Sequence, residues 1–176
     1  MELANYIGFF IWAFMSIFWL ISIPLQNVAI IDYAWGLSFV GVSLIAFKLG
    51  STEHIPLVIA VSIWGLRLFI HLLMRKTHLH EDKRYLAIRQ HYGVKNFWWQ
   101  SYAIIFMPQA SFVALMSIPL VLIQTTSIQD LTNMRWALIC SAWTIWSLGI
   151  MLETVSDWQL LQHKKNHPNR LCTTGL

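Results

Sequence analysis

The chain has 176 residues, of which 57% are hydrophobic and only 11% are charged. Soluble domains carry about 25% charged residues, so this composition excludes an ordinary soluble globular protein. The formal net charge of +4 does not indicate nucleic-acid binding, because the charges flank long apolar runs and are explained by orientation in a membrane. We therefore expect an integral membrane protein that contacts the lipid bilayer and has no nucleic-acid partner.

Five runs are long and apolar enough to cross a bilayer, which takes about 20 residues per helix. They cover residues 6–23, 28–47, 55–74, 102–123 and 136–154. The first run is longer than the core of a signal peptide, so we expect it to be a retained helix. Pro108 and Pro119 predict a kink in the fourth run. The predicted fold class is all-α, a polytopic helical bundle that forms a single membrane domain over residues 1–176.

The connections between these runs predict the orientation of the chain. The link 25–27 is short enough to make the first two helices a tight hairpin, whereas the segment 75–100 is long, polar and expected as a loop. That segment holds half of the Lys and Arg residues, and Lys164, Lys165 and Arg170 follow the last run. The positive-inside rule places both segments in the cytoplasm, which five spans allow, and places the N-terminus outside.

Ionisable side chains within the apolar runs are costly in a bilayer, so each needs an explanation. Arg67, His71 and Arg75 recur every four residues and share one face of the third helix. One interpretation is structural: Arg75 reaches the cytoplasmic interface and Arg67 pairs with an acid. The other is a site for an anionic ligand or a proton that opens to the cytoplasm. The residues alone leave both interpretations open.

Three acidic residues also lie in or next to these runs. Glu153 and Asp157 are four residues apart on one helix, where like charges repel and require a cation, a polar ligand or a retained proton. We predict that Arg67 lies within pairing distance of one of them, because an unpaired Arg at that depth costs at least about 2.5 kcal/mol. Asp32 begins the second helix, where the helix dipole favours an acid, and it could also face the same cavity as Arg67.

The polar segment contains two further patterns. The mixed-charge run 81–85 is either a solvated surface or a cover over a cytoplasmic opening. His78 and His80 form a His-x-His pair, but no cysteine lies nearby to complete a metal site. We therefore expect no metal.

Taken in order, these motifs resemble those of the mainly bacterial membrane proteins related to steroid 5-alpha-reductases, many of them described only as a domain of unknown function. The matching segments are Asp32-x-x-Trp35-Gly36, Trp64-Gly65-Leu66-Arg67-Leu68 with His71-Leu72 and Arg75, Glu81-Asp82-x-Arg84-Tyr85, Glu153-x-x-x-Asp157-x-Gln159-Leu160, and the tail from Asn166 to Leu176. Each motif is weak by itself, but their order and spacing cover nearly the whole chain. The resemblance also implies the bacterial cytoplasmic membrane as the location.

The resemblance implies an NADPH-dependent reductase that transfers a hydride to a carbon–carbon double bond conjugated to a carbonyl in a lipophilic substrate. A protein acid would polarise that carbonyl, and the catalytic candidates are Asp32, His71 and Glu153. The residues implied in cofactor binding are Arg67, Arg75, Arg84, Asp157 and Lys164. Leu72 stands where the steroid enzymes have a tyrosine associated with steroid recognition, so the substrate is not expected to be a steroid.

The resemblance further predicts that the chain is the N-terminal part of a fold of about seven helices. In the family, an Arg-His-Pro-Asn-Tyr-like motif and two more membrane segments follow the Gly-Leu pair that stands here at 175–176, and they supply much of the cofactor site. We therefore expect a truncated reductase that is incomplete or inactive as this chain. Two alternatives stay open, a membrane methyltransferase of the isoprenylcysteine or phospholipid type and a non-catalytic membrane protein.

Overall fold

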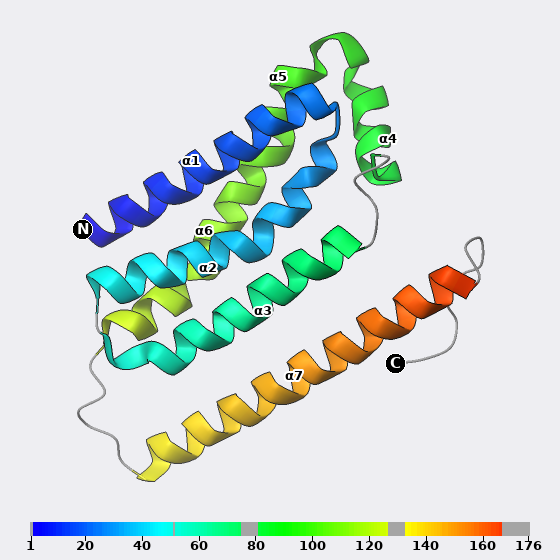
Figure 1. Cartoon of the computed structure of the whole chain (residues 1–176). Coiled ribbons are helices and arrows are strands. Elements are labelled where there is room, and N and C mark those ends of the chain that lie inside the picture. The colour runs from blue at the N-terminus through cyan, green and yellow to red at the C-terminus, as the bar shows by residue number, and fades with distance from the viewer. Residues whose placement is uncertain (1, 51, 75–80, 127–132, 167–176) are drawn as a thin grey trace. The chain divides into compact units, whose positions relative to one another are not determined.

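The computed structural model of the chain describes residues 2–50, 52–74, 81–126 and 133–166. Within these ranges every regular element is helical and no strand occurs. Five helical segments are long and apolar enough to cross a membrane, so the predicted all-α polytopic bundle is confirmed. The chain divides into two compact units, Met1–Ser127 and Ile128–Leu176, which are described separately (Figure 1).

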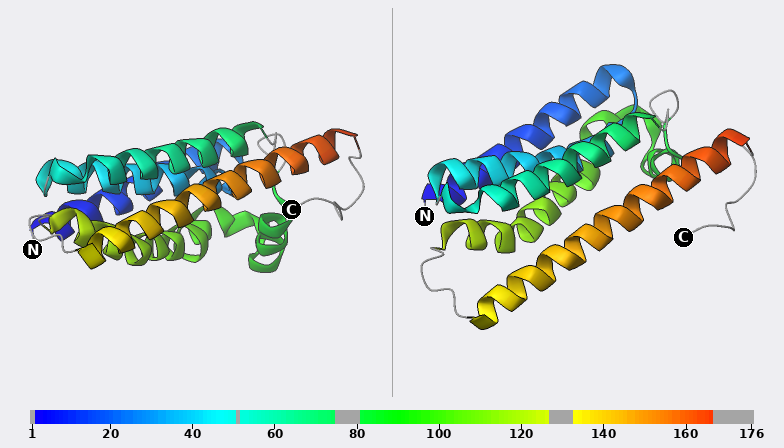
Figure 2. Two further views of the ribbon diagram at one scale, coloured as in Figure 1. Left: turned by 90° about the horizontal axis from the view of Figure 1, so that it is seen from below. Right: turned by 60° about the horizontal axis from the view of Figure 1, so that its bottom comes forward.

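The first unit is built around one central helix. Its membrane-length helices are α1 (Glu2–Leu25), α2 (Ile31–Leu49, preceded by the 3-10 turn η1, Val28–Ile30), α3 (Ile55–Met74, preceded by η2, Thr52–His54) and α6 (Met107–Thr125). Helix α2 contacts α1, α3 and α6 and is the most buried of the spans. Successive spans α1, α2 and α3 run in alternating directions (Figures 1 and 2).

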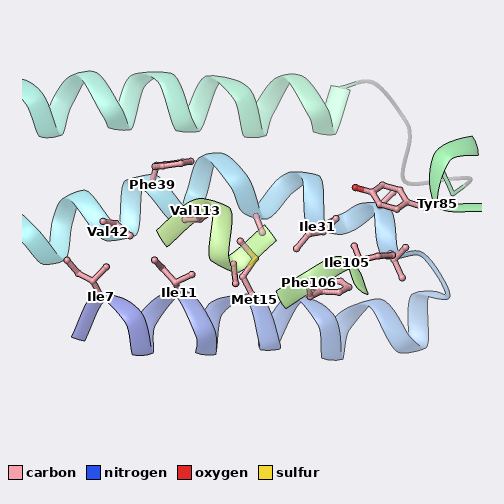
Figure 3. Packing of buried hydrophobic residues seen from close by; sticks show 14 of the residues in the cluster. Ile7, Ile11, Met15, Ile31, Phe39, Val42, Tyr85, Ile105, Phe106 and Val113 are labelled. Carbon is pink, nitrogen blue, oxygen red and sulfur yellow. The ribbon is translucent and has the colours of Figure 1, made fainter. Parts of the chain in front are cut away.

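The core of this unit lies between α1, α2 and α6 (Figure 3). Ile7, Ile11 and Met15 recur every four residues, and this spacing turns all three toward α2 and α6. Val42 from α2 and Val113 from α6 are fully buried against them. The outward faces of the same helices carry large exposed apolar side chains, as expected where lipid is the surrounding solvent.

Helices α2 and α3 approach each other through two glycines. An ideal Cβ atom on Gly65 would lie 2.5 Å from the carbonyl oxygen of Gly36, and a Cβ on Gly36 would be equally crowded by Gly65. Small residues let backbones come this close in membrane bundles. The rings of Tyr33 and Phe69, 6.2 Å apart, lie beside this contact. The register therefore places the first turn of α2 level with the last turns of α3.

The predicted hairpin between the first two spans is confirmed. Helix α1 ends at Leu25, directly after Pro24, and Gln26 adopts a positive φ of 51°. The Asn27 side chain then accepts a hydrogen bond of 2.9 Å from the backbone N–H of Ala29. This cap starts the second span after a link of only two residues.

The polar segment that was expected as a loop contains a helix, α4 (Lys83–Tyr92). Asp82 caps its start by accepting a hydrogen bond of 2.9 Å from the backbone N–H of Arg84. Gly93, with a φ of 89°, ends it in a conformation that favours glycine. The apolar periodicity that reveals longer helices is weak over these ten residues, so the sequence pattern did not indicate this helix.

The fourth span begins earlier than the predicted residue 102. It consists of η4 (Val94–Asn96), α5 (Phe97–Ser101), the π-helical turn η5 (Tyr102–Phe106) and α6 (Met107–Thr125). The π-helical turn ends two residues before Pro108, which has no N–H for the carbonyl four residues earlier. The structure thus has a π-helical turn before Pro108, whereas α6 continues through Pro119. The kink predicted from the two prolines stays a prediction.

The second unit is dominated by α7 (Asn133–Asn166), a single helix of 34 residues (Figure 2). It continues to Asn166 beyond the predicted end at residue 154. At 1.5 Å per residue it is about 51 Å long, whereas the hydrocarbon core of a bilayer is about 30 Å thick. Its polar C-terminal turns therefore extend past the hydrocarbon core.

Candidate functional site

Asp32, in the first turn of α2, receives two side chains from α4. The hydroxyl of Tyr85 donates a hydrogen bond of 2.7 Å to its Oδ1 atom. The Nη2 atom of Arg84 lies 3.4 Å from its Oδ2 atom, which makes an ion pair. The structure thus brings together a candidate catalytic residue and a candidate cofactor-binding residue, and it adds Tyr85, which the sequence had placed only within a motif.

Arg84 is held in place by the residue that caps its own helix. Its Nε and Nη2 atoms lie 3.1 and 3.2 Å from the two carboxylate oxygens of Asp82. This hydrogen bond to Asp82 raises the pKa of Arg84, so the guanidinium is always charged. The side chain remains 70% exposed, which leaves one edge of the fork open to an anionic group.

A second ion pair fastens α4 to the hairpin between α1 and α2. Arg89 donates from Nε and from Nη2 to the two carboxylate oxygens of Glu81, each at 2.8 Å. Glu81 also accepts a hydrogen bond of 3.0 Å from the backbone N–H of Val28, and Arg89 donates one of 3.1 Å to the carbonyl of Gln26. The side chain of Glu81 is only 6% exposed and that of Arg89 only 19%, so this ion pair is shielded from water.

The same face of α4 carries the ion pair and the tyrosine. Tyr85 and Arg89 are four residues apart and line up on one face of α4. Glu81 precedes the helix and meets that face through its ion pair with Arg89. The guanidinium of Arg89 also stacks 4.5 Å above the ring of Phe97, which is fully buried. These contacts on either side of Tyr85 fix its hydroxyl against Asp32.

Two further polar side chains continue the site into the membrane-spanning helices. The Nε2 atom of Gln109 on α6 donates a long hydrogen bond of 3.5 Å to the Tyr85 hydroxyl. Its Oε1 atom accepts a hydrogen bond from the indole N–H of Trp35 on α2. Sequence reasoning did not single out Gln109; the available signal was a polar amide inside an apolar run, directly after Pro108.

The surroundings of Tyr85 keep its phenol protonated. Burial raises the pKa of the Tyr85 hydroxyl above its usual range, and the charge and hydrogen bond of Asp32 raise it further. At neutral pH this side chain is therefore a hydrogen-bond donor.

We expect Asp32→Asn to lower the pKa of Tyr85, because the substitution removes a negative charge that opposes formation of the tyrosinate. The ionisation should move at least about one pH unit lower. Tyrosinate absorbance during alkaline titration, with the Tyr85→Phe curve subtracted, measures this directly. Glu53→Gln, in the 3-10 turn η2 that precedes α3, is the control and should leave the Tyr85 titration unchanged. An unchanged curve in Asp32→Asn would contradict the assigned contact.

The predicted residues of α3 lie close to this site in register. Arg67 and His71 are one turn apart on α3, and His71 is buried. The contact between Phe69, which stands between them, and Tyr33 places this turn beside the start of α2. Arg75, the pair His78 and His80, and the tail 167–176 lie outside the described residues.

Glu153, Asp157 and Lys164 all belong to α7, in the second unit. Their spacings of four and seven residues place them on one face of that helix. The predicted pairing of Arg67 with Glu153 or Asp157 would join the two units and stays a prediction. The assignment of one domain to residues 1–176 also stays a prediction.

The described residues contain five membrane-length helices, with a polar cluster where α2 begins, and these define the class: a polytopic α-helical integral membrane protein. The chain belongs to the family described as "Protein of unknown function (DUF1295)", whose model matches residues 18–176. The match includes Asp32, all of α4, Gln109 and the acids of α7. Neither the curated proteins nor the solved structures include a match to this chain.

Proposed function

We propose that this protein is a membrane-bound, NADPH-dependent, reductase-like protein that acts on a lipophilic substrate with a carbon–carbon double bond conjugated to a carbonyl. One observation carries the proposal: a protonated Tyr85 held by Asp32, with the exposed guanidinium of Arg84 beside them. The group combines a donor for a carbonyl oxygen with a cation for a phosphate. The ordered motifs that resemble the steroid 5-alpha-reductase relatives support the same reaction class.

Tyr85 is suited to polarise a substrate carbonyl. Its proton rotates about the C–O bond and can turn from Asp32 toward a carbonyl oxygen placed beside it. That hydrogen bond stabilises the negative charge that develops on the oxygen when a hydride adds to the conjugated double bond. Asp32 is then the group that holds the phenol in position before the substrate arrives.

The charged residues fit the binding of an anionic nucleotide. NADPH, when bound, supplies the hydride. Arg84 would contact a phosphate through the open edge of its fork. Because Asp32 and Asp82 offset part of its charge, further cations are required, and the exposed Lys83 next to it is one. The resemblance also implies Lys164, on α7, in cofactor binding.

An apolar neighbourhood suits a lipophilic substrate. The rings of Trp35 and Phe39 are 6.2 Å apart on α2, and Phe39 meets Trp64 of α3 at 5.7 Å. Trp35 is also the residue that connects through Gln109 to Tyr85. The aromatic side chains and the proton donor therefore belong to one contiguous set of contacts.

The test uses the full-length protein in lipid nanodiscs, with NADPH binding measured by energy transfer from tryptophan and turnover measured on lipophilic enones. We expect Tyr85→Phe to abolish turnover with unchanged NADPH binding, and Arg84→Gln to weaken NADPH binding about tenfold or more. Lys95→Gln, an exposed cation in η4, is the control and should change neither. Absence of NADPH binding would overturn the proposal, and binding of S-adenosylmethionine instead would favour the methyltransferase alternative.

A further inference from the structure

Four side chains from three helices form a continuous hydrogen-bond chain. The indole N–H of Trp35 donates to Gln109 Oε1, and Gln109 Nε2 donates to the hydroxyl oxygen of Tyr85 at 3.5 Å. The Tyr85 hydroxyl donates to Asp32 at 2.7 Å. The chain begins one turn inside α2, crosses to α6 and α4, and returns to the start of α2.

The chemistry of its members fixes the direction of this chain. An indole N–H is only a donor, so Gln109 must present its oxygen to Trp35. The amide NH₂ group then faces Tyr85, whose oxygen accepts and whose own proton is left to donate onward. A carboxylate is only an acceptor, so Asp32 ends the chain. Each hydrogen bond polarises the next, so the bonds of the chain depend on one another. Turning one side chain around would therefore break its hydrogen bonds to the neighbouring side chains.

The local backbone helps to aim Gln109. The π-helical turn η5 (Tyr102–Phe106) adds one residue to the helix shortly before it. In an α-helix one residue corresponds to a rotation of about 100°. Without the added residue, Gln109 would point about 100° away from Trp35 and Tyr85. Such π-helical insertions often occur at functional sites.

We propose that Gln109 is a positioning residue. Trp35 fixes the orientation of the Gln109 amide, and the amide NH₂ group in turn orients the Tyr85 hydroxyl. The inference rests on the proposed function only where it takes the oriented Tyr85 proton to be donated to a substrate carbonyl. Neither the sequence motifs nor the family match assigns a role to Gln109.

The first experiment needs neither substrate nor cofactor. Indole N–H resonances of the ¹⁵N-labelled protein in nanodiscs are recorded, and the Trp35 signal is assigned by its absence in Trp35→Phe. We expect Gln109→Met, which keeps the length of the side chain, to move the Trp35 signal upfield. Gln109→Glu should keep it downfield, because a carboxylate still accepts from the indole. Gln100→Met, in α5 of the same span, is the matched control and should leave the Trp35 signal in place.

The second experiment measures whether the orientation of the Tyr85 hydroxyl contributes to turnover. Gln109→Met and Gln109→Glu should each lower enone turnover about tenfold, because both lose the donor to Tyr85, with NADPH binding unchanged. A Trp35 signal that does not respond to Gln109→Met would overturn the positioning role, whatever the activity. Turnover unaffected by both Gln109 variants would also overturn it. If Tyr85→Phe leaves turnover intact, Tyr85 is not the carbonyl donor, and the role of Gln109 in turnover is overturned with it. Absence of both NADPH binding and turnover in the unmodified protein would instead overturn the proposed function, and the Trp35 signal would still decide whether Gln109 accepts from Trp35.

Discussion

Glu81→Ala is expected to release α4 from the hairpin between α1 and α2. The substitution leaves the shielded guanidinium of Arg89 without its carboxylate and the backbone N–H of Val28 without its acceptor. Removing one partner of a buried ion pair costs about 3–5 kcal/mol. Because Tyr85 lies on the same face of α4, its hydrogen bond to Asp32 should be lost together with the docking.

Hydrogen exchange of residues 83–92, followed by mass spectrometry in nanodiscs, measures this release. We expect rapid exchange in Glu81→Ala and wild-type protection in the control Lys83→Ala, which alters an exposed side chain of the same helix. The double variant Glu81→Met with Arg89→Met should recover part of the protection, because it removes both charges at once. Wild-type protection in Glu81→Ala would show that the ion pair does not hold α4.

Gly36→Ala is expected to destabilise the packing of α2 on α3. The added Cβ would overlap the backbone carbonyl of Gly65, which cannot rotate away as a side chain would, so the two helices must separate. Overpacking of this kind costs about 1–3 kcal/mol, more than the gain of about 1 kcal/mol from alanine's higher helix propensity. The same separation would move Asp32, one turn earlier on α2, away from its partners.

Thermal unfolding in detergent compares this variant with a matched control. Gly8→Ala makes the same change in α1, where an added Cβ meets no atom within 4 Å. We expect a lower midpoint for Gly36→Ala and an equal or slightly higher one for Gly8→Ala. Equal midpoints for the two variants would contradict the close helix contact.

The helical spans were predictable because their cause is local. A run of about 20 apolar residues must satisfy its own backbone in lipid, and only a helix does this within one segment. The third span coincides with its predicted range, and the others differ mainly at their ends. The polar helix α4 was missed because its stability comes from the cap at Asp82 and from docking, neither of which appears in apolar periodicity.

The candidate site was predictable only in part. Asp32 and Arg84 were chosen from the sequence, and their ion pair is present in the structure. Tyr85 and Gln109 were not chosen, because a tyrosine in a charged segment and an amide in an apolar run each have ordinary explanations. The role of each residue follows only from its contact with the other: Gln109 is 24 residues from Tyr85 in the sequence, yet its amide donates a hydrogen bond to the Tyr85 hydroxyl.

The sequence by itself determined that the protein lies in a lipid bilayer, its fold class and its number of spans, since these follow from the length of the apolar runs. It also determined the short hairpin, since the turn residues are next to each other in the chain. The tertiary structure decided the rest. The register of Gly36 against Gly65, the docking of α4 by Glu81 and Arg89, and the one-way hydrogen-bond chain ending on Asp32 join residues far apart in sequence. Such contacts depend on how helices pack, and no local pattern encodes them.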